Sequence, residues 1–439
     1  MKIKSIFIII FILFHSCKNG ISSKDFQTDK DFFYYEEKVE ENGLEPDISD
    51  LPVEQEELND DEIGYLDAIT EDFDEMEGEV EHIDLIPLSP SRPAMPCGAN
   101  CRQVSFLSTG DVGIEYDVWG DWLVIGTWQR PGGPVTHQIA LVNLVSLNYF
   151  IIDEKNFRVD SSGPAVGHPS IWQNKILYIF QINVEPGINY FTTFYLVDFQ
   201  EKIRTPIWNY TYPYGSSALG STCIFGNIAA WWDDRTSALG GDQVYMMDLN
   251  ERRDILVSDH CCLSHNPQIY GTKIVYDEGM SGSNMNIWLY DVATGEHRQL
   301  TNGDWDQFCP DIYENIVVWT DGRNGGTAMS ETNMDVYMMD LTTGEERPVC
   351  TYPSTQKKGV FVWGTKVTYA DTRNDPVYPD EGAFATEIDI YMTDIETGQE
   401  TQLTSLPGKE LYPLIHGNHV YFAKKDLENI WSVFEITLE

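Results

Sequence analysis

Seven copies of one short pattern constrain this chain more than any other feature of its 439 residues. Each copy is a two-residue turn followed by a run of β-branched and aromatic residues, as in Gly271-Thr272-Lys273-Ile274-Val275-Tyr276. The second turn residue falls at positions 121, 174, 227, 272, 315, 365 and 418, so the spacings are 53, 53, 45, 43, 50 and 53 residues. Such a period indicates a repeat architecture, in which each unit buries its apolar faces against its neighbours.

A second pattern follows the first within each unit. It is an alternating strand that usually ends in an acidic residue, such as Val244-Tyr245-Met246-Met247-Asp248. In three units a Thr-Gly pair comes next, beginning at Thr294, Thr343 and Thr397, and glycine supplies the positive φ of a hairpin turn. Each unit is therefore predicted to hold four strands: A before the tight turn, B after it, C with the acidic end, and D after the second turn.

Four-stranded units at this period predict an all-β fold, a seven-bladed β-propeller over residues 101–439. The seventh unit ends at Glu439, directly after its strand C. Ahead of the first unit, Arg102-Gln103-Val104-Ser105 matches the strand D sequence Arg298-Gln299-Leu300-Thr301. We therefore expect the N-terminal strand to complete the last blade and to close the ring, which removes an exposed sheet edge.

The fourth unit, from Pro267 to Thr301, resembles a TolB-type propeller repeat. The fifth unit, with Asp321-Gly322-Arg323 and Asp335-Val336-Tyr337, is similar to the variants found in cell-surface proteins of bacteria and archaea. The resemblance covers about residues 101 to 439 and is strongest in blades three to six. The Ser-Pro-Asp-Gly turn of the Tol-system protein is absent. The resemblance implies a fold, and a fold does not by itself imply a function.

The N-terminus has the features of an export signal. Lys2 and Lys4 precede a nine-residue apolar run, Ile6 to Phe14, which is too short to span a bilayer and is typical of a signal peptide. Ser16-Cys17 then resembles a bacterial lipoprotein cleavage site, which implies a signal peptide over residues 1–17 and lipid attachment at Cys17. The alternative is an ordinary signal peptide with an incidental cysteine. The expected location is the bacterial cell envelope.

Residues 18–100 are predicted to be an acidic, largely disordered tether. Positions 36–84 hold 22 Asp and Glu and one Lys, or −21 of the chain's net charge of −42. Like charges repel, and little apolar surface is available to offset the entropy of ordering. The tether either holds the folded part away from the membrane or only adds solubility. Such acidity excludes nucleic acid as a partner and disfavours adhesion to anionic lipid, so the lipid anchor is the one expected membrane contact.

Three strand B ends share an Asp-x-Arg pattern: Asp233 with Arg235, Asp321 with Arg323, and Asp371 with Arg373. Because a single ligand site rarely repeats in several blades, we predict that these are structural turn pairs. No cofactor and no metal are expected. Calcium at the segment from Asp371 to Glu387, which contains Asp375, Asp380 and Glu381, is the alternative, although the segment does not match the twelve-residue calcium loop.

The remaining candidate chemistry is sparse. The densest group of soft ligands is His260, Cys261, Cys262 and His265, which forms either a zinc site or a linker with buried or oxidised cysteines. No Gly-x-Ser-x-Gly nucleophile motif occurs, and no catalytic residue is predicted.

Seven cysteines remain after Cys17, and an exported protein can form disulfides. Cys97 and Cys101 are close enough in sequence to close a small loop. Two further pairings would each bracket one blade: Cys223 with Cys261 or Cys262, and Cys309 with Cys350. These require the linkers to cross the blade rim, because two other strands separate strand A from strand D.

The B–C loops are long and unlike one another, whereas the A–B and C–D turns are short. Long, dissimilar loops on a rigid scaffold usually carry binding, and Tyr190, Tyr378 and Phe384 are the aromatic candidates on them. We therefore predict a non-catalytic binding propeller whose B–C loop face contacts an envelope protein or a glycan. The alternatives are a propeller-type polysaccharide lyase acting on uronic glycans, with His, Tyr and Arg in the central funnel, and a structural scaffold of an envelope assembly.

Overall fold

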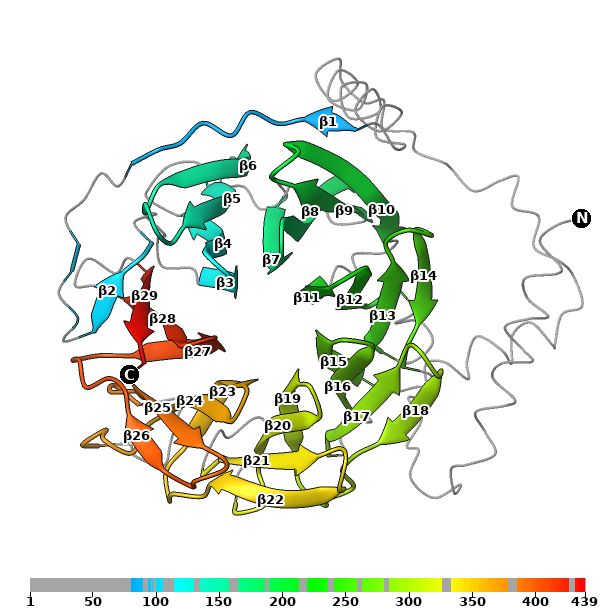
Figure 1. Ribbon diagram of the computed structural model, residues 1–439. Helices are drawn as coiled ribbons and strands as arrows, with labels where there is room; N and C mark the ends of the chain where they lie inside the picture. The colour runs from blue at the N-terminus through cyan, green and yellow to red at the C-terminus, as the bar shows by residue number, and fades with distance from the viewer. Residues whose placement is uncertain are drawn as a thin grey trace, which may run out of the picture. The chain divides into compact units, whose positions relative to one another are not determined.

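The described part of the chain forms seven antiparallel sheets arranged as blades around one axis (Figure 1). The computed structural model describes residues 80–89, 94–95, 97, 100–105, 114–129, 135–157, 165–185, 189–212, 219–235, 241–258, 263–279, 284–325, 333–377, 385–425 and 431–438. The prediction of an all-β, seven-bladed propeller with four-stranded blades is confirmed. These residues contain no helix long and apolar enough to cross a membrane.

The strands of the first three blades follow one another from the axis outward in chain order. Blade one consists of β3 (Ile114–Trp119), β4 (Trp122–Gln129), β5 (Val135–Asn143) and β6 (Tyr149–Phe157). Blade two consists of β7 (Ala165–Trp172), β8 (Lys175–Glu185), β9 (Asn189–Asp198) and β10 (Ile203–Tyr212). Blade three consists of β11 (Leu219–Phe225), β12 (Ile228–Asp233), β13 (Gln243–Asp248) and β14 (Arg253–Leu256).

Blades four to six repeat this order. Blade four consists of β15 (Leu263–Tyr270), β16 (Lys273–Gly279), β17 (Asn286–Asp291) and β18 (Glu296–Gln299). Blade five consists of β19 (Gln307–Tyr313), β20 (Ile316–Asp321), β21 (Asp335–Asp340) and β22 (Glu345–Cys350). Blade six consists of β23 (Gln356–Trp363), β24 (Lys366–Asp371), β25 (Asp389–Asp394) and β26 (Glu400–Gln402). Blade seven contains β27 (Glu410–His416), β28 (His419–Lys425) and β29 (Trp431–Thr437).

The repeated turn has the same backbone geometry in every blade. Its first residue has a φ between 54° and 63° in all seven copies, a left-handed conformation that favours glycine. Five copies carry glycine there, while blades two and five carry Gln173 and Glu314. A Cβ on Gly271 would meet nothing within 4 Å, so glycine is required there by its backbone conformation and not by space.

The apolar core is divided among the contacts between blades. Seven buried clusters each join side chains of two neighbouring blades, and the cluster that includes Leu123 and Tyr421 joins blade one to blade seven. The fourth residue after the second turn position is fully buried in every strand B. These residues are Ile125, Tyr178, Trp231, Tyr276, Trp319, Tyr369 and Phe422. Alternation along strand B therefore drives the packing of one blade against the next.

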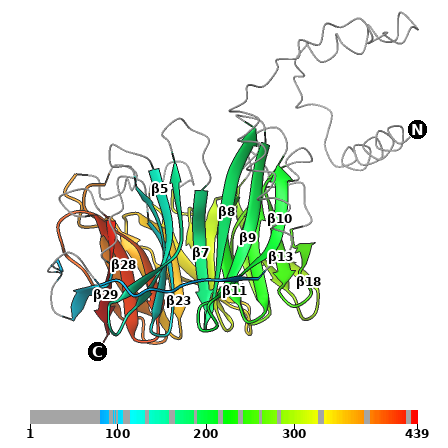
Figure 2. The same cartoon turned by 90° about the horizontal axis from the view of Figure 1, so that it is seen from above.

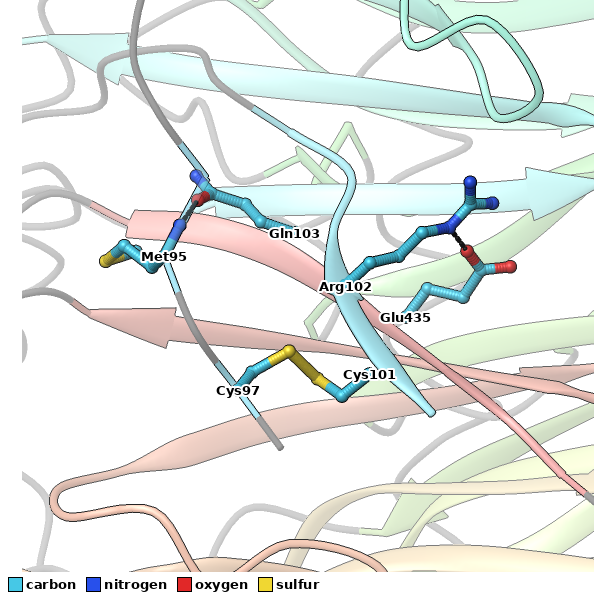
Figure 3. The surroundings of a disulfide bond; sticks show 6 residues. All are labelled: Met95, Cys97, Cys101, Arg102, Gln103 and Glu435. Carbon is cyan, nitrogen blue, oxygen red and sulfur yellow. Dashed lines mark hydrogen bonds and ion pairs between the residues drawn. A yellow bond between two sulfur atoms is a disulfide. The ribbon is translucent and has the colours of Figure 1, made fainter. Parts of the chain in front are cut away.

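The ring is closed by the N-terminal strand, as predicted. Strand β2 (Cys101–Gln103) pairs antiparallel with β29 as the outermost strand of blade seven. A disulfide joins Cys97 to Cys101 beside this strand (Figure 3). Gln103 accepts a hydrogen bond from the N–H of Met95 (2.8 Å), and Arg102 pairs with the buried carboxylate of Glu435. The disulfide and these contacts fix the approach of the chain to its closing position.

A second outer contact was not expected from the sequence. Residues 80–89, here called the strap, run along the outer edges of blades two and one (Figure 1). Strand β1 (Glu81–His82) pairs with β10, and Leu88 exchanges backbone hydrogen bonds with Tyr149 at 2.8 and 3.0 Å. The strap lies in the range predicted as tether. Most of that range lies outside the described residues, so the tether stays a prediction, and its last part is attached to the propeller.

Candidate functional site

The strands of every blade run between two faces of the ring (Figure 2). Because neighbouring strands are antiparallel, the A–B and C–D turns lie on one face, and the B–C loops and D–A links lie on the other. The ring therefore offers two separate faces for binding.

The base of the B–C loop face is held by buried hydrogen bonds. In blades three, four and six a hydroxyl of the D–A link accepts the N–H of the second residue of strand C. These bonds are Val244 N to Ser258 Oγ (3.0 Å), Ile287 N to Thr301 Oγ1 (2.9 Å) and Ile390 N to Thr404 Oγ1 (2.8 Å). The three hydroxyl residues are buried, so the strand ends beneath the loops are fixed before any partner arrives.

The three Asp-x-Arg segments also belong to this base. In each, the arginine donates to the fully buried aspartate two residues earlier: Arg235 to Asp233 (2.7 Å), Arg323 to Asp321 (2.7 Å) and Arg373 to Asp371 (2.5 Å). Each guanidinium also lies over a tyrosine of strand C and forms an ion pair with an acid of strand D. These partners are Tyr245 and Asp254 for Arg235, Tyr337 and Glu346 for Arg323, and Tyr391 and Glu400 for Arg373. The same unit thus links strands B, C and D in three blades.

The predicted binding aromatics lie at or beyond the limit of the described residues. Tyr378 and Phe384 are outside them. The prediction that Tyr190 lies on a B–C loop is wrong, because its backbone belongs to strand β9 and pairs with Asn183 and Tyr212; its side chain lies outside the described residues. The B–C loops of blades one, two and seven lie outside the described residues, and those of blades three to six are described in part. The structure therefore positions the strands that carry these loops, and binding by these three residues stays a prediction.

The segment from Asp371 to Glu387 is anchored inside the blade. The carboxylate of Asp375 accepts the N–H groups of Val377 (2.8 Å) and Glu387 (2.8 Å) and the hydroxyl of Thr386 (2.9 Å). Ala385, between these anchors, is buried. Asp375 is thus engaged by the protein itself, while Asp380 and Glu381, the other acids of the calcium alternative, lie outside the described residues. Among the residues that are described, no three acidic, His or Cys groups gather as a metal site.

The soft-ligand group is described only at His265. Its Nε2 lies 2.7 Å from Asp242 Oδ2, and its ring packs edge-on against Trp232. His260, Cys261 and Cys262 are outside the described residues, so the choice between zinc and a linker stays open.

The central channel presents a feature that sequence reasoning missed. Each strand A ends, directly before the tight turn, in an aromatic residue that lines the channel: Trp119, Trp172, Phe225, Tyr270, Tyr313, Trp363 and His416. Ring centroids of successive members are 4.2 to 5.8 Å apart around the whole circle, so the seven rings form a closed aromatic collar. All seven are partly exposed. Trp119 also approaches Phe225 and Trp363, so it lies across the opening.

Behind the collar lies a cavity of about 120 Å³ that two carboxylates line, those of Asp117 and Asp311. Each accepts an N–H from the innermost strand of the next blade, Ile171 to Asp117 (2.8 Å) and Val362 to Asp311 (2.8 Å). Burial raises the pKa of Asp117 to about 6 and that of Asp311 to about 7, although these hydrogen bonds oppose the shift. The charge of Asp117 further raises the pKa of Asp311.

The innermost strands, which form one edge of each blade, are also bulged. Strand A of blades two to seven has a register shift with a left-handed residue in it: His168, Ser221, Asn266, Cys309, Gly359 and Tyr412. A bulge bends the strand and frees one residue from the ladder. The N–H of His168 accordingly donates to Glu115 (2.7 Å) and that of Cys309 to Asp277 (2.7 Å), which are acids of the preceding blades.

The electrostatic character of the cavity follows from its lining. Neither lysine nor arginine is among the described residues that line it. Burial lowers the pKa of His416 to about 4, and its Nε2 accepts the N–H of Gly120 (3.1 Å), so this ring is neutral near pH 7. The site can attract cations, and it would repel the carboxylate of a uronic sugar. The lyase alternative requires His, Tyr and Arg at this opening; among the described residues His416, Tyr270 and Tyr313 line it, but no arginine does.

The two disulfides predicted to bracket blades are wrong. Cys223, Cys309 and Cys350 are thiols. Cys309 lies on β19 and Cys350 on β22, the innermost and outermost strands of blade five. Three steps of about 4.8 Å separate these strands, whereas a disulfide needs Cα atoms within about 7 Å. The link after strand D therefore does not bring the two sulfurs together.

The comparisons with known proteins identify the fold. No family model and no curated protein matches the sequence. Among solved structures, the propeller domain of the trilobed protease from Pyrococcus furiosus matches with 10% identity and a TM-score of 0.51, over 73% of this chain and 94% of that one. A prolyl endopeptidase structure matches with 8% identity and a TM-score of 0.50, over 76% of this chain and 51% of that one. TolB from Acinetobacter baumannii matches with 14% identity and a TM-score of 0.39, over 73% and 80%. The first two likenesses show a β-propeller and nothing of its activity.

Proposed function

We propose that this chain is a lipid-anchored binding propeller of the bacterial envelope, and that its B–C loop face contacts a protein or a glycan. The observation that carries the proposal is the fixed base of that face. Buried hydrogen bonds and three Arg–Asp units hold the strand ends from which the long, dissimilar loops emerge. Such preorganisation reduces the entropy that binding costs, as in other loop-bearing scaffolds.

Export is supported by a feature independent of the N-terminal sequence. Cys97 and Cys101 form a disulfide at the point where the chain enters the ring. Disulfides persist in oxidising compartments such as the bacterial periplasm and the cell surface. A disulfide beside the closing strand fits a protein that folds after leaving the cytoplasm.

The binding proposal is tested by replacing residues 378–384 with a Gly-Ser linker of equal length. This range leaves Asp375, Ala385 and Glu387 in place, whereas replacement of the whole segment from Asp371 would also remove an Arg–Asp unit and buried core. The immobilised variant should lose the protein or glycan that the wild-type chain retains from solubilised envelopes, with an unchanged melting temperature. The matched control replaces Thr342 and Thr343, in an exposed C–D turn of the opposite face, by serine. Loss in the control alone would contradict the proposal.

The anchor is tested separately at Cys17. Cys17→Ser should move the chain from the membrane fraction to the soluble fraction and abolish labelling by a fatty-acid probe. A variant that stays in the membrane fraction and keeps its full length would refute lipidation as the attachment.

A further inference from the structure

We propose that the cavity behind the aromatic collar binds a small organic cation of the alkylammonium type. This site lies on the face opposite the B–C loops, and it goes beyond the proposed function. The inference rests on three features that meet at one place: a closed circle of aromatic rings, two enclosed carboxylates and a cavity of matching size.

The first feature is the collar. An organic cation is attracted to the face of an aromatic ring when it lies within about 6 Å of the ring centroid, and aromatic cages recognise methylated ammonium groups in this way. All seven rings of the collar line the cavity, so a cation within it would face several rings at once. Three of the seven rings are tryptophans, the best donors of this interaction.

The second feature is the pair Asp117 and Asp311. Both line the cavity, and both accept hydrogen bonds from backbone N–H groups: Asp117 from Val118 and Ile171, and Asp311 from Val362. The charge of one disfavours ionisation of the other. No cationic side chain of the described residues lines the cavity, so a ligand would supply the positive charge that this pair lacks.

The third feature is size. The cavity measures about 120 Å³. A cavity needs only about 10 to 15 Å³ of such space to hold one water molecule, so this one accommodates several waters or one small organic group. A tetrahedral methylated ammonium group has this size, and its low hydration cost suits an aromatic wall. The described residues offer no three-ligand metal set, which favours an organic cation over a metal ion.

The pH dependence of binding follows from the groups that face the ligand. These are Asp117, Asp311, His416, Cys223, Tyr270 and Tyr313. Burial raises the pKa of Asp117 to about 6 and of Asp311 to about 7, so both gain charge between pH 5 and pH 8. Burial lowers the pKa of His416 to about 4 and raises the pKa values of the Cys223 thiol and the Tyr270 hydroxyl, so these three stay uncharged in that window. Affinity for a cation should therefore rise from pH 5 to pH 8.

The test compares two probes on the full wild-type chain by titration calorimetry at pH 8. Choline is the cation, and dimethylbutanol, in which carbon replaces the charged nitrogen, is its neutral isostere. We expect choline to bind at least about tenfold more tightly than the isostere, a difference of about 1.4 kcal/mol. Equal affinity would show an apolar cavity and overturn the proposal, and so would the absence of binding by choline. Calcium chloride serves as a third probe, and tighter binding of calcium than of choline would also refute it.

Variants locate the site within the chain. Asp117→Asn combined with Asp311→Asn should weaken choline binding at least about tenfold, and Trp119→Phe should weaken it less, because one ring is kept. The matched control is Glu314→Gln, an exposed acid of the A–B turn face that does not line the cavity. Replacement of residues 378–384 should leave choline binding unchanged, so the outcome is independent of the B–C loop proposal. Full choline affinity in the double aspartate variant, with its melting curve intact, would place the ligand elsewhere.

Discussion

Removal of Arg235 tests whether the Arg–Asp unit is an essential part of the blade. Its side chain is 11% exposed, and its partner Asp233 is fully buried. In Arg235→Met the aspartate loses its charged partner and keeps only hydrogen bonds such as that from Trp231 Nε1 (2.8 Å). Breaking a buried pair by removing one partner costs about 3 to 5 kcal/mol. Since domains are stable by only about 5 to 15 kcal/mol, this variant should lose a large part of its stability.

The assay is urea denaturation followed by tryptophan fluorescence and extrapolated linearly to water. Arg298→Met is the matched control, because its pair with Glu296 is 3.8 Å long and both side chains are largely exposed. That change should cost less than about 1 kcal/mol. The double variant Asp233→Asn with Arg235→Met should recover part of the loss, because asparagine carries no buried charge. The reasoning fails if Arg235→Met and Arg298→Met differ by less than about 1 kcal/mol, since burial then does not decide the effect.

Three further predictions follow from the fold. The folded-state pKa values of Asp117 and Asp311, about 6 and about 7, lie above the ordinary value of 3.8, so the contribution of these groups to stability falls as pH rises from about 4 to 7. The melting temperature of the double variant Asp117→Asn with Asp311→Asn should therefore decline less over that range than the melting temperature of the wild type. An equal decline would contradict these pKa values. Gly271→Ala should lower the free energy of unfolding by about 1 to 2 kcal/mol, because φ is +63° at this position, whereas Glu314→Gly, at the same turn position of blade five, should not lower it. Equal losses of unfolding free energy in urea denaturation would show that the turn conformation is not the cause. The double variant Ile83→Ala with Leu85→Ala should lower the free energy of unfolding by about 1 to 2 kcal/mol and increase the rate of proteolysis within the strap, because both side chains pack on the core between blades one and two. An unchanged cleavage rate would mean that the attachment of the strap does not depend on this packing.

The amino-acid sequence by itself determined the fold of the ring. Alternating strands of known length, separated by turns with glycine at left-handed positions, specify a four-stranded unit locally, and seven such units can bury their two faces only against one another. The closing strand was also predictable, because Arg102-Gln103-Val104-Ser105 has the composition of a strand D and the last unit lacks one. Each of these inferences uses information within one unit or a comparison between units.

The aromatic collar carried a signal that could have been found. An aromatic residue precedes the turn in every unit, at positions 119, 172, 225, 270, 313, 363 and 416. Alignment of the units shows the periodicity, but not which side of the strand faces the axis. The carboxylates behind the collar gave no such signal, since Asp117 and Asp311 have no acidic counterpart at the same position in blades two, three, four, six and seven.

Only the tertiary structure decided the contacts between segments that lack a shared pattern. The strap contains a two-residue strand, β1, within an acidic stretch that has no periodic pattern. This strand pairs with β10, the outer edge of blade two, and that edge is present only once blade two has formed. The bracketing disulfides were wrong because Cys309 and Cys350 lie at the two ends of one unit in the sequence, whereas the width of the blade holds them apart. Local periodicity specifies strands and turns, but the distance between strand edges, and the meeting of side chains around an axis, arise from the assembled ring.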